Sequence, residues 1–336
     1  MIDNGKDQGN VEDHVAGAHA DTTVITVDKL VKSYNGTDVL SGIDLNVQRG
    51  EIFGLLGPNG AGKTTTLECV VGLRAPTSGT VRVFGLNPAK ARAEITSRVS
   101  VQPQSASLFE TLTVGETLRL FASFYANPRD WREVIDEVGL SHQGAVRTKH
   151  LSGGQNRRLL IGIALMSQPE VVVLDEPSAG LDPAARQNLW GTITGLSAAG
   201  TTIVLSTHHM DEATSLCHRV GILVSGKIVA LGTPEELIRQ RNADTTVSFT
   251  VPARTDQKIL KGLGPDGAVR IDETSGEWRV HVRTETPDDL VRSIAFNLAI
   301  EASDYDIRRG SLEDLFIELA DEGSPTNADS DSPEPV

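Results

Sequence analysis

The chain carries two groups of residues whose types and spacing suit phosphate chemistry. Residues 57–64 read Gly-Pro-Asn-Gly-Ala-Gly-Lys-Thr and fit the pattern G-x-x-x-x-G-K-[ST]. Glycine lets the backbone approach a phosphate closely, and a helix that begins here directs its positive end toward the anion. We therefore expect Lys63 and the backbone amides of residues 60–64 to hold the β- and γ-phosphates of a nucleoside triphosphate, with the Thr64 hydroxyl as a ligand of Mg²⁺.

The second group is a pair of adjacent carboxylates, Asp175 and Glu176, which follow the apolar run 171–174. Like charges repel, so such a pair at the end of a buried strand has little structural use. One carboxylate at a strand end can hold the Mg²⁺ shell, and its neighbour can orient and activate the attacking water. We predict the first role for Asp175 and the second for Glu176.

The elements that must position these residues follow from the apolar pattern. A strand at 51–56 leads into the glycine loop and a helix at 63–72 leaves it, which is the context that a genuine phosphate loop requires. Further strands are expected at 22–27, 40–47, 80–84, 98–102, 171–174 and 201–206, with a hairpin at 220–231 and helices at 184–196 and 210–217. This alternation predicts an α/β core. Residues 113–166 instead hold three helical stretches, which predict a helical insertion.

The region after residues 240–244 has a different pattern. Strands are expected at 245–251, 268–272, 277–283 and 301–308, with helices at 255–263, 287–298 and 312–320. The order β-α-β-β-α-β is the ferredoxin-like plan with one extra terminal helix. We thus predict an α/β domain at 22–240, with a helical subdomain at about 113–166, and a small α+β accessory domain at 244–320. Residues 1–21 and 321–336 lack apolar periodicity and are expected to be disordered acidic tails.

The net charge of −14 is unevenly placed along the 336 residues. Residues 1–21 hold five acidic side chains against one lysine, and residues 321–336 hold five with no base, so the tails carry −9 of the total. The body lacks the basic stripe that nucleic-acid binding needs, and we expect no nucleic-acid partner. No apolar run approaches the ~18 residues of a membrane span. Any work at a membrane therefore needs another chain to supply the span.

A third motif, Leu151-Ser-Gly-Gly-Gln155, lies between the phosphate loop and the carboxylate pair. Together the three motifs resemble those of the ATP-binding cassette (ABC) ATPases, and the resemblance covers about residues 22–235 with every motif in order. It implies a P-loop NTPase core with a helical insertion, an active ATP hydrolase, and ATP and Mg²⁺ as cofactors. Ser152 and Gly154 match residues that close over the γ-phosphate bound on the opposite subunit, which implies a head-to-tail homodimer.

The resemblance assigns roles to several single residues. Tyr34 matches the aromatic residue that stacks on adenine. Gln104 matches the glutamine of a hinge that senses Mg²⁺ and faces the membrane partner, with Gln102 as a nearby rival. His208 matches a histidine that contacts the γ-phosphate, with His209 as the alternative. The implied nucleotide-binding residues are Tyr34, Gly57, Pro58, Asn59, Gly60, Ala61, Gly62, Lys63, Thr64, Thr65, Ser152, Gly153, Gly154, Gln155 and Asp182, with Glu176, His208 and Gln104 as catalytic residues and Thr64, Gln104 and Asp175 at the metal.

Within the superfamily, the phosphate loop, residues 205–213 and the terminal stretch 311–319 look like those of daunorubicin-resistance-type ATPases of drug exporters. That likeness implies a separate integral-membrane permease, a place at the cytoplasmic face of the cell membrane, and export of a hydrophobic drug, antibiotic or lipid-like compound. The terminal stretch can also be interpreted as an amphipathic helix docked on the accessory domain. Asn156 departs from the pattern, since a basic residue is common there.

Two other functions fit the cassette motifs. One is a soluble ABC ATPase that works on ribosomes, DNA or cluster assembly. Ribosomal forms usually carry two cassettes and DNA-maintenance forms a long coiled coil, neither of which is present in this sequence. The other is the ATPase of an importer, although residues 244–320 do not obviously resemble the oligonucleotide-fold extension of many sugar importers.

Overall fold

The computed structural model describes residues 22–104, 106–241, 245–265, 267–274, 276–308 and 310–322. The predicted tails at 1–21 and 323–336 lie outside the described residues. Residues 321 and 322, which we expected in the acidic tail, belong to the last helix instead.

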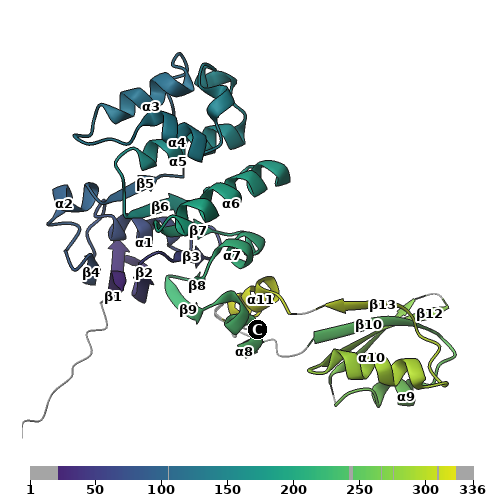
Figure 1. Ribbon diagram of the computed structural model, residues 1–336. Helices are drawn as coiled ribbons and strands as arrows, with labels where there is room; N and C mark the ends of the chain where they lie inside the picture. The colour runs from purple at the N-terminus through teal and green to yellow at the C-terminus, as the bar shows by residue number, and fades with distance from the viewer. Residues whose placement is uncertain are drawn as a thin grey trace, which may run out of the picture.

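The main sheet has six strands in the order β5-β6-β7-β3-β8-β9 (Figure 1). Its strands are β5 Val99–Gln102, β6 Val171–Asp175, β7 Thr202–Thr207, β3 Ile52–Leu56, β8 Arg219–Val224 and β9 Lys227–Gly232. All neighbours are parallel except β8 and β9, which form the expected hairpin. The carboxyl ends of β3, β6 and β7 therefore meet at one end of the sheet, which is where α/β sheets bind ligands.

The side chains of the central strands alternate between two hydrophobic cores. On β3, Ile52 and Leu56 face a core shared with α5 (Gly153–Leu165), α6 (Pro183–Ala198) and α7 (Met210–Leu216). Phe53 and Leu55 face the opposite core, which contains α1 (Lys63–Val70). Burial on both faces explains why these strands are continuous apolar runs in the sequence.

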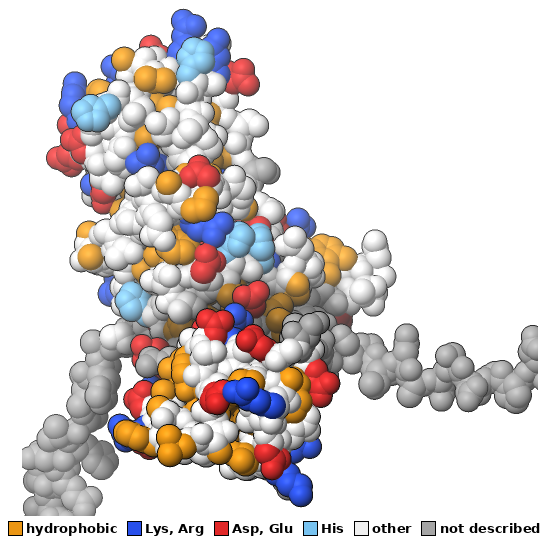
Figure 2. Space-filling view, turned by 90° about the vertical axis from the view of Figure 1, so that its right-hand side faces the viewer, with side chains coloured by type: hydrophobic (Ala, Val, Ile, Leu, Met, Phe, Trp, Pro, Cys, Tyr) orange, Lys and Arg blue, Asp and Glu red, His pale blue; other side chains and the backbone are white. Residues whose placement is uncertain are grey.

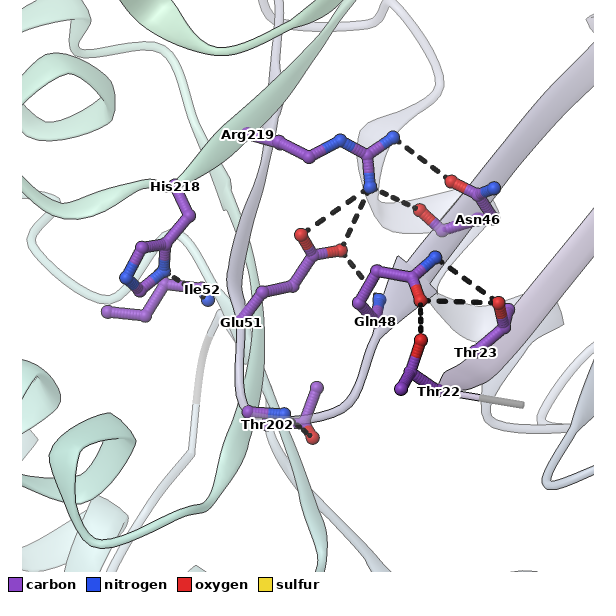
Figure 3. A network of polar contacts seen from close by, with 10 residues as sticks. Thr22, Thr23, Asn46, Gln48, Glu51, Ile52, Thr202, His218 and Arg219 are labelled. Atoms are coloured by element: carbon purple, nitrogen blue, oxygen red, sulfur yellow. Dashed lines mark hydrogen bonds and ion pairs between the residues drawn. The ribbon is translucent and has the colours of Figure 1, made fainter. Parts of the chain in front are cut away.

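A second, antiparallel sheet of three strands covers α1's side of the main sheet. Its order is β2-β1-β4, from β1 Thr23–Tyr34, β2 Thr37–Gln48 and β4 Ser78–Val83. Figure 3 shows the polar network that joins it to β3 and β8. The buried Glu51 carboxylate accepts from Arg219 Nη1 at 3.2 Å and from the backbone amide of Gln48 at 2.7 Å, and Arg219 Nη2 donates to Asn46 Oδ1 at 3.0 Å. Separation of the two sheets would break these contacts and leave the buried Glu51 charge unpaired, so the network holds the sheets together.

The helical subdomain contains the expected three helices, α3 (Val114–Ala122), α4 (Trp131–Glu137) and α5. Two of them begin at reciprocal capping boxes, in which a hydroxyl accepts from a backbone amide three residues on and that residue's side chain accepts in return. Thr113 and Glu116 form the box of α3, and Ser152 and Gln155 form the box of α5. A short helix before β5, α2 (Arg92–Thr96), was not predicted.

The accessory region forms a separate four-stranded sheet with its own core, which includes Phe249, Leu260 and Ile294. Its elements are β10 Thr245–Pro252, α9 Gln257–Lys261, β11 Val269–Thr274, β12 Glu277–Thr284, α10 Pro287–Phe296 and β13 Ser303–Arg308. The strand order is β11-β12-β10-β13, with every pair antiparallel. The element order is the one predicted, and the ferredoxin-like plan remains our interpretation of it.

Two helices connect this sheet to the α/β domain. They are α8 (Pro234–Arg241), which was not predicted, and α11 (Leu312–Glu322). The alternative that α11 docks on the accessory domain is wrong, because Leu312, Leu315 and Leu319 are buried in the core that contains α5, α6 and α7. Their spacing forms one apolar stripe along α11, and α7 and α8 cover it.

On the face that Figure 2 shows, acidic and basic side chains are interspersed, and the basic ones do not gather into a stripe. Among the described residues, no helix is long and apolar enough to cross a membrane.

Leu315 and Ile317 offer a test of how α11 is packed. Leu315 is fully buried and Ile317 is 55% exposed. Leu315→Ala should lower the free energy of unfolding by about 2–5 kcal/mol, because it leaves a cavity in the core. Ile317→Ala on the same helix should change it by no more than about 0.5 kcal/mol. Urea unfolding followed by tryptophan fluorescence measures both, and equally small effects would contradict the packing of α11 on the core of the α/β domain.

Candidate nucleotide-binding site

The glycine loop between β3 and α1 has the close packing that its sequence predicts. A Cβ at Gly57 would lie 2.4 Å from the Leu223 carbonyl oxygen, so only glycine fits there. Gly62 has a φ of 107° and precedes the first turn of α1. Lys63 is buried, and its Nζ donates to the carbonyls of Gly57 at 2.8 Å and Pro58 at 3.1 Å. The loop thus curls around the ammonium group at the positive end of the helix.

The carboxylate pair lies beside this loop, at the end of β6. Thr64 Oγ1 donates to Asp175 Oδ2 at 2.9 Å, and Ser206 donates a short hydrogen bond to the other oxygen of Asp175. A hydroxyl and a carboxylate this close are hard oxygen donors of the kind that Mg²⁺ prefers, with phosphate oxygens completing its shell. The donor set of Thr64 and Asp175 therefore fits the expected metal ion.

Glu176 is the centre of the polar contacts at the site. It is 8% exposed, and its Oε1 lies 3.1 Å from Lys63 Nζ. Its Oε2 lies 3.3 Å from His208 Nδ1 and accepts from Gln104 Nε2 at 3.5 Å. Burial alone would raise the pKa of Glu176, but the hydrogen bond and charge of Lys63, with a smaller effect of His208, hold that pKa below its usual value. The side chain is therefore an anion at neutral pH, as a general base must be.

These contacts also separate the rival residues. Gln104 reaches Glu176, whereas Gln102 is buried and donates to the carbonyl of Pro103. His208 reaches Glu176, whereas the ring of His209 lies against the ring of His208, with 4.1 Å between their centroids. Burial, followed by the charge of His208, lowers the pKa of His209. The geometry favours Gln104 and His208 as the residues that act at the site.

A cavity of about 310 Å³ joins the phosphate loop to Glu176. Its lining residues are Val39, Asn59, Gly60, Gly62, Lys63, Thr64, Thr65, Gln104 and Glu176. All of them except Val39 were expected at the site, Glu176 as a catalytic residue and the others as nucleotide- or metal-binding residues. Val39 lies on β2 and belongs to no motif, so no pattern in the sequence marks it.

The remaining expected residues lie outside the lining of this cavity. Tyr34 ends β1, half-buried, with Lys32 Nζ 5.1 Å and the Arg74 guanidinium 5.5 Å from its ring centroid. Ser152 is exposed at the start of α5, and a Cβ on Gly154 would come within 2.8 Å of the Ala185 side chain. Asp182 caps α6 by accepting from the Ala185 amide at 2.9 Å. The signature motif thus packs on the first turn of α6 and does not line the cavity at the phosphate loop of the same chain.

Known proteins resemble this chain in sequence and in fold. The family described as ABC transporter matches residues 40–179. The Nod factor export ATP-binding protein I of Paraburkholderia xenovorans is 42% identical, over 88% of this chain and 96% of that protein. The daunorubicin/doxorubicin resistance ATP-binding protein DrrA of Streptomyces peucetius is 34% identical, over 89% and 92%. The linearmycin resistance ATP-binding protein LnrL of Bacillus subtilis is 30% identical, over 88% and 98%.

Solved structures agree with these relatives. An ATP-binding subunit of an ABC transporter superposes with a TM-score of 0.58 at 32% identity, covering 65% of this chain and 93% of that one. The cbiO1 protein of Clostridium perfringens, part of the ABC transporter complex cbiONQ, gives a TM-score of 0.60 at 28% identity, covering 66% and 95%. With relatives matched along nearly their whole length, the chain belongs to the ATP-hydrolysing ATP-binding proteins of ABC transporters, among those with drug-resistance and Nod factor export relatives.

Proposed function

We propose that this chain is the energising subunit of an ABC exporter. It acts as a head-to-tail homodimer on the cytoplasmic face of the membrane and drives a separate permease. The observation that carries the proposal is the convergence of Lys63, Gln104, Glu176 and His208 on one cluster, with the signature motif placed outside it. We infer that this cluster holds and cleaves a triphosphate once a second copy supplies the signature residues.

In this mechanism the chain's own residues act in sequence. In the structure, Lys63 is paired with Glu176. When phosphate oxygens bind Lys63 instead, the Glu176 carboxylate can hold the attacking water and accept its proton. His208 and Gln104 keep this carboxylate in place. Mg²⁺ held by Thr64 and Asp175 would neutralise phosphate charge. Because ATP contacts both copies only in the closed dimer, ATP binding shifts the population toward closure, and hydrolysis reverses it.

The proposed cargo is a hydrophobic drug, antibiotic or lipid-like compound. The support is the set of relatives: one is named for linearmycin resistance, one for daunorubicin and doxorubicin resistance, and one for Nod factor export. The third name specifies export, and the first two fit removal of a toxic compound. We infer that the permease, rather than this chain, selects the compound.

A hollow beside the helical subdomain fits the permease contact. It has a volume of about 570 Å³, and Val101 and Phe124 are among its lining residues. Phe124 is 68% exposed, and its ring meets Phe121 edge-on at 5.8 Å. Exposed aromatic rings around a hollow are typical of a protein contact. Since β5 leads from this hollow to Gln104, a short apolar helix of the permease seated here would lie next to the hinge of the site.

Lys63→Ala tests the phosphate loop. Loss of the ammonium group should weaken ATP binding by about 10- to 100-fold, the range expected for hydrogen bonds to a charged group. Lys90→Ala, at an exposed lysine, is the matched control and should leave the affinity unchanged. Fluorescent-nucleotide titration measures both, and equal affinities in the two variants would argue against the assigned role of Lys63.

Glu176→Gln tests the base and the partner together. The change keeps the shape of the side chain but removes the proton acceptor, so hydrolysis should fall by about 10²–10⁴-fold while ATP is retained. The ATP-bound variant should therefore accumulate as a closed dimer. Affinity purification from detergent-solubilised membranes should then recover a multi-span permease. Recovery with ribosomes or another cytosolic partner would instead support a soluble ABC ATPase, and undiminished turnover would remove Glu176 from its role.

Phe124→Glu tests the permease contact. A charge in the hollow should abolish co-purification with the permease, yet ATP hydrolysis by the isolated protein should continue, since Phe124 does not line the nucleotide cavity. Phe296→Glu is the control, because Phe296 is also exposed (80%) but ends α10 in the accessory domain. Loss of the permease from both variants, or from neither, would exclude this hollow as the specific contact.

A further inference from the structure

A side chain from the helical subdomain holds the backbone of Gln104. Arg157, on α5, donates from Nη1 to the Gln104 carbonyl oxygen at 2.8 Å. Gln104 follows β5 and lies outside any helix or strand, so no ladder of backbone hydrogen bonds fixes its peptide group. A guanidinium bond to a carbonyl is charge-assisted and directional. The contact therefore sets the orientation of the peptide that carries the Gln104 side chain.

The same glutamine continues the chain of contacts to Glu176. Its Nε2 donates to Glu176 Oε2 at 3.5 Å, so two hydrogen bonds in series join α5 to the carboxylate. Arg157 is half-buried; burial lowers the pKa of its guanidinium, and the negative charge of Glu176 partly offsets that effect. Arginine remains a cation at neutral pH in any case. Its charge thus acts on the site as well as its hydrogen bond.

Arg157 also has a fixed relation to the signature motif. Ser152 caps α5, and Arg157 lies in the second turn of that helix. A helix moves as a rigid rod at these lengths, so a displacement of Ser152 displaces the Arg157 backbone with it. We propose that Arg157 is a positioning residue that couples the position of the signature helix to the Gln104 amide, and through it to the Glu176 carboxylate. The proposal rests on the roles given above to Gln104 and Glu176.

The neighbouring arginine is a natural control. Arg158 is of the same type and is half-buried, and burial lowers its pKa as well. Its Nη1 donates to the carbonyls of Val138 at 3.1 Å and Gly139 at 2.9 Å, both at the end of α4. These contacts stay inside the helical subdomain. Arg158→Ala should therefore affect the stability of the subdomain without a specific effect on Gln104.

The experiment compares ATP hydrolysis by the full-length protein as a function of Mg²⁺ concentration. Arg157→Ala should lower kcat by about 10- to 100-fold, as expected for loss of a charged hydrogen bond, and raise the half-saturating Mg²⁺ concentration by about tenfold. ATP affinity without Mg²⁺ should stay unchanged. Arg157→Lys, which keeps a cation able to reach the carbonyl, should recover part of kcat. Arg158→Ala should keep the Mg²⁺ dependence of the wild type.

A double-mutant cycle decides whether Arg157 acts through Gln104. If it does, Gln104→Ala should cause a similar change, and the variant with both substitutions should lose no more than the worse single variant. Effects of the two substitutions that multiply, or equal Mg²⁺ curves for Arg157→Ala and Arg158→Ala, would overturn the proposal. A wild-type Mg²⁺ curve for Gln104→Ala would also overturn it. The exporter function is judged separately, by permease capture with Glu176→Gln, a variant in which Arg157 is intact.

Discussion

The geometry of the site depends on the buried ion pair between Lys63 and Glu176. Their charged atoms lie 3.1 Å apart, one at the start of α1 and the other at the end of β6. In the sheet, β7 lies between β6 and β3. The end of β7 holds the segments that follow both neighbours, because the Gly57 backbone amide donates to the Thr207 carbonyl and the Glu176 backbone amide donates to Ser206 Oγ at 3.0 Å. Burial of two opposite charges costs solvation energy, and their attraction repays that cost only when the two groups are held in such a fixed arrangement. A ligand that breaks this ion pair must supply other anionic oxygen atoms to the Lys63 ammonium group, and a triphosphate has such atoms.

Much of the fold could be predicted because its strands are buried on both faces. Residues 51–56, 171–174 and 201–206 are apolar runs bounded by polar residues or turns, and each became a central strand. Short elements were harder: α2 has one buried residue, Ile95, so it leaves almost no periodic signal. The packing of α11 was also beyond the sequence. An amphipathic stripe shows that a helix has an apolar face, but it does not show which surface covers that face.

The site divides in the same way. Motif residues that share one loop, such as Gly60 and Gly62 to Thr65, could be predicted together because the loop itself brings them to the cavity. Residues from different elements could not. Val39 comes from β2 and lies beside Gly62 of the phosphate loop, and Arg157 comes from α5 and donates to the Gln104 carbonyl. The rival glutamines are two residues apart and the rival histidines one, and only their contacts in the fold distinguish them.

The accessory domain is joined to the ATPase in a way that bears on the same site. The chain leaves the ATPase through α8 and returns through α11, and these two helices pack against each other and share one core with the ATPase. Residues 245–308 therefore form an insertion held at two neighbouring points rather than a free appendage. α11 also packs on α7, which begins two residues after His208. Glu313 and Phe316 of α11 line a cavity of about 400 Å³ with His208 and His209. Because packed helices shift together, a displacement of α11 cannot leave the His208 segment unaffected.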